Sequence, residues 1–309
     1  MSTTSERAVH AATIVRPARE QTPFRRFLSD YFESKTATGA LMVFGIILFI
    51  AIFAPWISPQ DPYDLMVVDV MDSRLPPGEK SLNGVTFFLG SDGAGRDMLS
   101  AIFYGLRTSL GVGVMSGVIA LCIGMAVGLT AAYFGGRTDS FIMRVVDLQL
   151  SFPAILIALI LLSILGKGVD KIIIALVIAQ WAYYARTVRA SALVERRKEY
   201  IEAATCLALS HRRIVFRHLL PNVLPPLIVV GTLQTAHAIS LEATLSFLGV
   251  GLPQTEPSLG LLISNGFEYM LSGKYWISFF PGVALLITIV SINLVGDQLR
   301  DVLNPRLER

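Results

Sequence analysis

The feature that most constrains this chain is a succession of apolar runs, most of them close to the length that crosses a membrane. A transmembrane helix needs roughly 20 predominantly apolar residues. Such runs lie at 39–57, 108–134, 145–165, 172–184, 224–245 and 277–295, and the fourth is short for a span. Only 16% of the residues are charged, against about 25% in an average soluble domain. The sequence therefore predicts an all-α integral membrane protein with about six transmembrane helices.

Polar stretches between the runs divide the chain into parts. We expect an N-terminal tail over 1–38 with an interfacial helix near 24–31, a first transmembrane helix over 39–57, and a loop over 58–99. A core domain over 100–300, which includes a polar loop at 190–221, and a tail over 301–309 complete the chain. Pro153 is expected to kink the third helix, and Pro221 to stop a short basic helix before the fifth.

The distribution of Lys and Arg orients the chain, because basic residues near span ends favour the cytosolic side. With about six spans, both termini share a side with the loops at 135–144 and 186–222, and this side carries 19 of the 26 basic residues. We therefore expect both termini and the polar loop at 190–221 in the cytosol, and the 58–99 loop outside. A net charge of +3, with no basic stretch interleaved with aromatic residues, argues against a nucleic-acid partner.

A charged segment, Glu199 to Pro221, interrupts the apolar sequence. Its first part predicts a short helix with two faces, one holding Glu199, Glu202 and Cys206 and the other Ile201, Ala204 and Leu207. Alanines at 203, 204 and 208 leave little bulk, and Ser210 stands where it would cap the basic helix that follows. The pattern favours a helix that docks into a groove of another protein. A solvated loop, or a basic patch that binds anionic lipid, is the alternative from the pattern alone.

The sequence offers no site for chemistry of its own. No P-loop is present: Gly166-Lys167 has no glycine five residues earlier and no Ser or Thr after it, so it cannot cradle a phosphate. Zinc-type His and Cys spacings and a nucleophile elbow are absent as well. We therefore expect neither an enzyme nor a bound cofactor or metal in this chain. Energy for uphill transport would enter through a partner or an ion gradient.

An ion-driven carrier would place ionisable side chains within the membrane. The candidates are Asp147, near the start of the third run, and Glu242, near the end of the fifth. Both lie near span ends, where helix-end hydrogen bonds are the simpler explanation of a charged side chain. Gln234 and His237 would either line a polar pathway or make interhelical hydrogen bonds. These four residues are the candidates for lining a pathway.

Several short motifs occur along the chain. In order they are Phe88-Leu89-Gly90-Ser91-Asp92 with Gly95-Arg96-Asp97, Tyr104 to Leu110, Tyr133-Phe134-Gly135-Gly136, Met143 to Asp147 with Ser151-Phe152-Pro153, Glu202-Ala203-Ala204 followed by Ile214 and Leu220-Pro221-Asn222, Leu245 to Gly249, and Gly296 to Asp301 with Asn304-Pro305-Arg306. From about Thr36 onward the chain resembles the dipeptide/oligopeptide/nickel permease family of binding-protein-dependent ABC importers, in its second-permease (C-type) branch. Glu202-Ala203-Ala204 corresponds to the EAA motif of that family.

The resemblance implies a type I ABC importer permease fold with a cytosolic EAA coupling helix, in a bacterial-type inner membrane. In this family two homologous permease subunits form the pathway, two ABC ATP-binding subunits dock beneath them, and an extracytoplasmic solute-binding protein delivers the substrate. ATP and Mg²⁺ bind the partner subunits, where hydrolysis drives alternating access. The residues that would contact the ATP-binding subunit are Tyr200, Ile201, Glu202, Ala203, Ala204, Leu207, Ala208 and Leu209.

The expected function is ATP-driven import of di- or oligopeptides, with nickel chelates or glutathione-like molecules as alternative substrates. An ion-coupled secondary transporter is the alternative from another class, and a membrane scaffold would leave the docking helix without a purpose. Two positions depart from the family pattern. Ala208 replaces a usual glycine, and alanine disfavours a left-handed turn there. Leu259 stands where tryptophan is frequent, in a loop expected to make external contacts.

Overall fold

The computed structural model describes residues 23–64, 66–81 and 84–303, and over these residues the chain is helical apart from loops and two isolated β-bridges. The helices are α1 (Pro23–Glu33), α2 (Lys35–Ile57), α3 (Met98–Phe134), α4 (Gly136–Leu150), α5 (Ala154–Leu165), α6 (Val169–Arg196), α7 (Glu199–Cys206), α8 (His211–Arg213), α9 (Leu220–Phe247), α10 (Leu259–Phe267) and α11 (Trp276–Leu303). A π-helical segment, η2 (Ile214–Leu219), joins α8 to α9. Most of the predicted N-terminal tail and the motif at 304–306 lie outside the described residues.

Four helices in the described part of the chain are long and apolar enough to cross a membrane: α2, α3, the continuous helix formed by α8, η2 and α9, and α11. The pair α4 and α5 makes a fifth if it is counted as one broken span. The predicted fourth span corresponds to α6, which has the length but carries Lys171, Gln180 and Arg186 along its apolar stretch. By length and composition the fold therefore supplies four or five spans. α6 accounts for one of the six expected that is missing, and the broken α4–α5 pair accounts for the other when only four are counted.

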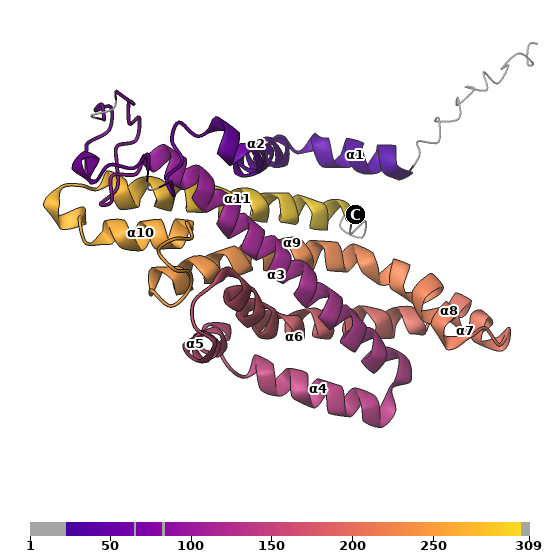
Figure 1. The fold of residues 1–309 in the computed structure, drawn as a ribbon. Coiled ribbons are helices and arrows are strands. Elements are labelled where there is room, and N and C mark those ends of the chain that lie inside the picture. Colours follow the sequence, from indigo (N-terminus) through magenta and orange to yellow (C-terminus); the bar gives the residue numbers. More distant parts are fainter. Residues whose placement is uncertain (1–22, 65, 82–83, 304–309) are drawn as a thin grey trace, which may run out of the picture.

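The predicted third span is two helices rather than one kinked helix. α4 ends at Leu150, α5 begins at Ala154, and their axes differ by 85°. Pro153 lies between them, where it lacks an N–H and disfavours the helical conformation of the residue before it. The expected kink is thus a complete break, which turns α5 away from α4 (Figure 1).

The expectation that Pro221 stops the basic helix is wrong. The helix that begins at His211 continues through Pro221, as well as Pro225 and Pro226, to Phe247. Immediately before Pro221 the chain is π-helical, and the Leu220 N–H bonds to the carbonyl of Val215. Pro221 then occupies the first turn of the α-helical part, where its missing N–H costs least.

The centre of the bundle is formed by α3, which crosses both α6 and α9 (Figure 1). Glycines on α3 allow the helix backbones to come close. A Cβ atom at Gly124 would lie 2.6 Å from the carbonyl oxygen of Trp181, and one at Gly128 would lie 2.5 Å from that of Ala185. Because contacts this short leave no room for a side chain, the small residues of α3 fix its packing against α6, as is common between helices in lipid.

The predicted loop between the first two spans is folded against the ends of α3, α10 and α11. Asp97 caps α3 by accepting from the Ser100 N–H (2.9 Å), and the Asp97 N–H donates to Gln60 Oε1 (2.9 Å). Trp276 Nε1 donates to the carbonyl of Ser91 (3.2 Å). Burial raises the pKa of Asp97. The segment 58–97 is therefore a hydrogen-bonded cap over one end of the bundle.

Leu259 does not make external contacts. It begins α10 and is fully buried, and its Cδ2 lies 3.3 Å from the point that a Cβ of Gly105 would occupy. The departure from the family pattern at this position therefore concerns the packing of α10 on α3.

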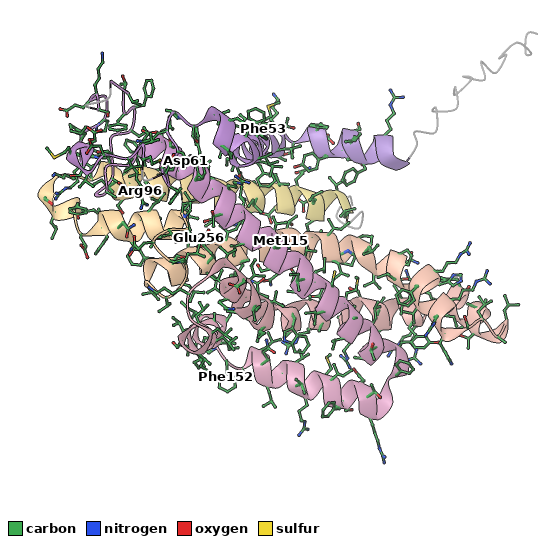
Figure 2. All side chains as sticks on the ribbon, viewed as in Figure 1. Phe53, Asp61, Arg96, Met115, Phe152 and Glu256 are labelled. Atoms are coloured by element: carbon green, nitrogen blue, oxygen red, sulfur yellow. The ribbon has the colours of Figure 1, made fainter. Side chains whose placement is uncertain are left out.

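The outer surface shows where lipid would contact the chain. Apolar side chains such as Phe53, Met115 and Phe152 are exposed along the middle of the molecule (Figure 2). Asp61 and Arg96 lie instead in the cap segment at one end (Figure 2). Because an exposed apolar band between polar ends matches the profile of a bilayer, this surface agrees with an integral membrane protein.

Candidate functional site

The charged segment that interrupts the apolar sequence forms α7, a separate short helix at the end of the bundle opposite the cap segment (Figure 1). It follows α6 after a two-residue turn and leads back into α8. Its outer face carries Glu202 and Ala203, both exposed, and its inner face carries Ile201 and Ala204, both buried. The helix thus presents a surface that nothing in the described part of the chain covers.

A small apolar cluster holds α7 in place. Ile201 and Ala204 pack with Ile214 of the following helix, and Leu209 and Tyr133 complete the cluster. Tyr133 comes from the last turn of α3, so α7 is attached to the end of the central helix of the bundle. α7 is therefore in direct contact with the end of α3 and with the helix that contains α9.

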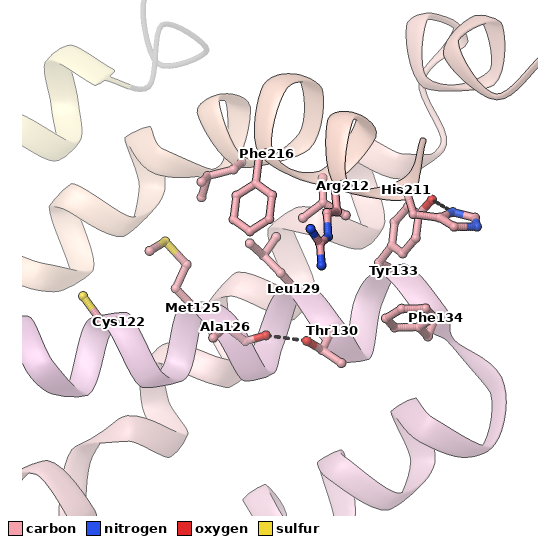
Figure 3. Close-up of a pocket in the computed structure, with 12 residues that line it drawn as sticks. Cys122, Met125, Ala126, Leu129, Thr130, Tyr133, Phe134, His211, Arg212 and Phe216 are labelled. Carbon is pink, nitrogen blue, oxygen red and sulfur yellow. Dashed lines mark hydrogen bonds between the residues drawn. The ribbon is translucent and has the colours of Figure 1, made fainter. Parts of the chain in front are cut away.

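Polar contacts reinforce this attachment. The hydroxyl of Tyr133 bonds to Nδ1 of His211 at 2.5 Å (Figure 3). On the other side of α7, Tyr200 Oη donates to Glu195 Oε2 at 2.7 Å. Burial, and then this hydrogen bond, raises the pKa of Tyr200 to about 12, so the phenol stays protonated as the donor at neutral pH. The start of α7 is thus bonded to the end of α6, and the α8 segment that follows α7 is bonded to α3.

A cavity of about 310 Å³ lies beside this attachment, between the last turns of α3 and the α8–η2 segment. Its walls are apolar, with Arg212 and Thr130 among its few polar members (Figure 3). Thr130 Oγ1 donates to the carbonyl of Ala126 in its own helix. Leu219 of η2 packs with Leu129 and Ala132 of α3, so the α8–η2 segment contacts α3 on both sides of this cavity.

The end of α7 is a Schellman motif centred on Ala208. The Leu209 N–H bonds to the carbonyl of Ala204 (3.2 Å) and the Ala208 N–H to that of Thr205 (2.9 Å), the pair of bonds that defines the motif. Ala208 has φ +52°, in the left-handed region. The turn that glycine usually makes is therefore kept by alanine, at a conformational cost of roughly 1–2 kcal/mol.

Ala208→Gly is expected to stabilise the end of α7, since glycine adopts the left-handed conformation without a Cβ clash. The larger conformational entropy that glycine loses on folding offsets part of this gain, so the net stabilisation is about 0.5–1 kcal/mol. Hydrogen exchange of the Leu209 amide should slow roughly two- to fivefold. Ala203→Gly is the matched control: it lies in the regular part of α7 and should destabilise by about 1 kcal/mol. Equal effects of the two substitutions would contradict the motif.

The structure divides the eight residues predicted to contact a partner. Five of them are exposed: Tyr200, Glu202, Ala203, Leu207 and Ala208. Leu209 is half-buried, and Ile201 and Ala204 are buried against other residues of the chain. Leu207 was expected on the same face as Ile201 and Ala204, but it is 74% exposed because the helix ends at Cys206. Ser210 takes the N-cap position of α8 without a side-chain capping bond.

The four candidate pathway residues do not converge on one site. Asp147 pairs with Arg186 (2.5 Å), and both side chains are more than half exposed. His237 is exposed on α9, whereas Gln234 is half-buried with an Oε1 atom that has no hydrogen-bond partner in the described part of the chain. Of the four, Gln234 alone has an unused polar atom inside the bundle.

Glu242 is not at a surface and lines no pathway in this structure. It is fully buried, and its two carboxylate oxygens accept from Ser109 Oγ (2.8 Å) and Ser246 Oγ (2.7 Å). Ser109 also accepts from the backbone N–H of Leu259 (3.3 Å). Glu242 therefore joins α9 to α3 and to the start of α10. Sequence position alone could not reveal this, because Ser109 lies 133 residues away.

Sequence reasoning missed two buried polar residues of α6, Gln180 and Tyr184. Both are completely shielded, and the polar atoms of both side chains lack partners within the described residues. A glutamine inside an apolar run was the available signal, because polar side chains within a membrane are costly and tend to have a function.

Comparison with known proteins assigns the chain to a family. Residues 120–309 match the family model described as the binding-protein-dependent transport system inner membrane component. Residues 22–77 match the N-terminal TM domain of oligopeptide transport permease C. The chain belongs to the family of binding-protein-dependent transport system inner membrane components, which confirms the resemblance seen in the motifs.

Several curated relatives share most of their length with this chain. It is 38% identical to the dipeptide transport system permease protein of Escherichia coli strain K12, with 100% of both chains covered. It is 36% identical to the di/tripeptide transport system permease protein of Pseudomonas aeruginosa, with 93% of each covered. A putative peptide transport system permease protein of Brucella suis is 41% identical over 87% of each chain.

A solved structure shares the fold. A chain of the MetNI methionine ABC transporter, in an inward-facing conformation, matches with a TM-score of 0.55 and 23% identity. The match covers 66% of this chain and 97% of that one. The predicted type I ABC importer permease fold is thereby confirmed.

Proposed function

We propose that this chain is a permease subunit of an ATP-driven importer of di- or oligopeptides. The family to which it belongs, and relatives that are named dipeptide or di/tripeptide permeases, support this function. The observation that carries it is α7, whose outer face is free while its inner face is fixed to the transmembrane helices. Such a helix transmits motion from an outside partner to the membrane.

The partners belong to the same proposal, and the family to which the chain belongs supports them. A second, homologous permease subunit completes the pathway, and two ABC ATP-binding subunits each receive one coupling helix. The outer residues of α7, Glu202 and Ala203 in particular, seat in the ATP-binding subunit. Closure of the ATP-binding subunits around ATP and Mg²⁺ then moves α7, and through Tyr133 and Ile214 it moves α3 and α9. This chain needs no nucleotide or catalytic residue of its own.

The orientation is also part of the proposal. α7 lies in the cytosol with both termini, in a bacterial-type inner membrane surrounded by lipid. α1, α7 and the end of α11 lie toward the same end of the bundle (Figure 1), as this topology requires. The 58–97 cap segment then faces outward, where an extracytoplasmic solute-binding protein delivers the peptide.

The ion-coupled alternative is not favoured. Both carboxylates that could bind a coupling ion already have partners. Asp147 forms an ion pair with Arg186, and Glu242 accepts hydrogen bonds from Ser109 and Ser246. Among the described residues no group of three or more His, Cys, Asp or Glu is arranged to hold a metal ion. A coupling-ion site would need a carboxylate open to a pathway.

Reconstitution tests the proposed function directly. The chain is placed in proteoliposomes with its second permease, its solute-binding protein and labelled di- or tripeptide, with and without the ATP-binding subunits. We expect uptake that requires ATP, stops with vanadate and survives ionophores that collapse ion gradients. Uptake without ATP, or uptake abolished by the ionophores, would reject the proposal. Nickel chelates and glutathione, offered in the same assay, identify the alternative substrates.

A further inference from the structure

The cavity between α3 and the α8–η2 segment lies where two spans reach the same membrane surface. The span of α3 ends at Phe134, and the span formed by α8, η2 and α9 begins at His211. Both residues line the cavity. Phe134 and Phe216, which also lines it, are 64% and 65% exposed. The cavity is therefore open to the surroundings of the protein, at the level where lipid headgroups begin.

The apolar wall of the cavity is about as long as one leaflet of a bilayer is deep. On α3 the lining residues extend from Cys122 to Phe134, which lie about 18 Å apart along the helix axis. Half of the hydrocarbon core of a bilayer is about 15 Å thick. Of the 12 lining residues, only Thr130, Tyr133, His211 and Arg212 have nitrogen or oxygen atoms in their side chains. An acyl chain that lies along α3 would therefore meet apolar side chains over most of its length.

One permanently charged side chain projects into this apolar space. The guanidinium of Arg212 points toward α3, beside Leu129 and Thr130 (Figure 3). Arg212 makes no ion pair or hydrogen bond within the described residues, and no acidic residue lines the cavity. A guanidinium is a planar fork of donors that matches the oxygens of a phosphate. The cavity thus combines a phosphate-binding group with an apolar wall.

The surrounding sequence adds positive charge and nothing that cancels it. Residues 211–218 contain three arginines and two histidines, and no Asp or Glu occurs between Glu202 and Glu242. Basic residues next to a span attract anionic lipid headgroups by about 1 kcal/mol for each Lys or Arg. An acidic protein surface would also pair with the arginines, but it would leave the apolar cavity empty. A phospholipid supplies both the phosphate and the apolar chain, and it surrounds every membrane protein.

We propose that this cavity binds one anionic phospholipid, whose phosphate pairs with Arg212 and whose acyl chain lies along α3 between Leu129 and Phe216. The volume of about 310 Å³ is near the lower limit of about 300 Å³ for sites that enclose a drug-sized molecule. The cavity therefore holds part of the lipid, and the rest stays in the bilayer. The bound lipid contacts α3 and the α8–η2 segment together, beside the hydrogen bond between Tyr133 and His211. The inference does not depend on which solute the chain transports.

Photoactivatable phosphatidylglycerol tests the site in the assembled transporter. The complete complex is reconstituted in phosphatidylcholine vesicles that contain a small amount of phosphatidylglycerol with a diazirine in one acyl chain. After illumination, mass spectrometry locates the crosslinked residues. We expect crosslinks at 122–134 and 211–220, which unlabelled phosphatidylglycerol displaces and additional phosphatidylcholine does not. Equal displacement by the two lipids would mean that the cavity contacts only the bulk bilayer, and it would contradict the proposal.

Arg212→Gln tests the phosphate contact, because it removes the charge and keeps a polar side chain. Crosslinking at the cavity should fall about tenfold, since a charge-assisted hydrogen bond is lost. Arg213→Gln is the matched control: it removes the same charge from the next position, which is exposed and does not line the cavity. That variant should retain most of the crosslinking. An equal loss in both variants would show attraction to a basic segment in general, not a site.

Ala126→Phe tests the acyl-chain contact without a change of charge. Ala126 is exposed in the wall of the cavity, so the phenyl ring takes the space that the chain would occupy. Crosslinking should fall about as much as in Arg212→Gln. Ile123→Phe is the control, because Ile123 is exposed on the same helix and does not line the cavity. Each of the four replaced side chains is exposed, so co-purification of the partner subunits should show that every variant assembles.

Two further results would overturn the inference. One is a complete complex whose crosslinks lie outside the cavity. The other is crosslinking at the cavity that occurs only when the ATP-binding subunits are left out, which would assign this surface to those subunits. Neither result concerns peptide uptake, so the proposed function would stand. Conversely, a complex that transports no peptide would leave the lipid crosslinks unchanged.

Discussion

Glu202→Arg is expected to release the ATP-binding subunits and to abolish ATP-driven uptake. The side chain is exposed on the outer face of α7, and it makes no ion pair or hydrogen bond in the described part of the chain. Its carboxylate is thus available to a partner. Reversing a charge at the centre of an interface costs about 2 kcal/mol or more, which weakens binding roughly 30-fold. Co-purification of the ATP-binding subunits with the tagged permease measures the effect.

The membrane fold should survive this substitution, because the Glu202 side chain is exposed and arginine is a good helix former. Glu79→Arg provides the matched control: it reverses an exposed carboxylate in the cap segment, at the opposite end of the bundle. That variant should retain the ATP-binding subunits fully. If Glu202→Arg retains them as well and transports peptide, α7 is not the contact.

Glu242→Leu is expected to destabilise the protein by about 2–6 kcal/mol. The substitution leaves the hydroxyls of Ser109 and Ser246 buried without their acceptor, at roughly 1–3 kcal/mol each. It also disconnects α9 from α3 at the start of α10. Thermal melting of the purified protein in detergent should show the loss. Glu268→Leu, at an exposed glutamate after α10, should leave the melting temperature nearly unchanged.

Glu242→Gln separates this structural role from ion coupling. The glutamine amide has the same shape and can pair with both serine hydroxyls, which donate or accept as needed. Uptake should therefore stay within about twofold of wild type, because the glutamine keeps a hydrogen bond to each serine. In an ion-coupled carrier the same change removes the titrating group and abolishes transport. A stable but inactive Glu242→Gln variant would thus revive the alternative.

The attachment of α7 leads into the closely packed middle of the bundle. α7 contacts Tyr133 at the end of α3, and Gly124 and Gly128 further along that helix hold it against α6 with no space for a side chain.

Some expectations from sequence differ from the structure for local reasons. Pro153 and Pro221 present the same chemical restriction, yet the chain breaks at the first and continues through the second. The difference is the π-helical segment before Pro221. Because the hydrogen-bonding pattern changes from π to α there, Pro221 falls in the first turn of the α-helical part, where a missing N–H costs least. Ala208 is a similar case, since the packing of Ile201 and Leu209 holds alanine in a conformation it disfavours alone.

The sequence by itself determined the membrane class, the family and the position of the short helix α7. These depend on the length of apolar runs and on motifs whose residues are close together in the chain. Only the tertiary structure decided which face of α7 is free, that Glu242 is enclosed by Ser109 and Ser246, and that the Tyr184 hydroxyl has no hydrogen-bond partner among the described residues. The physical reason is that burial and hydrogen bonding depend on which helices become neighbours. Residues far apart in the chain make those contacts, and no local pattern specifies them.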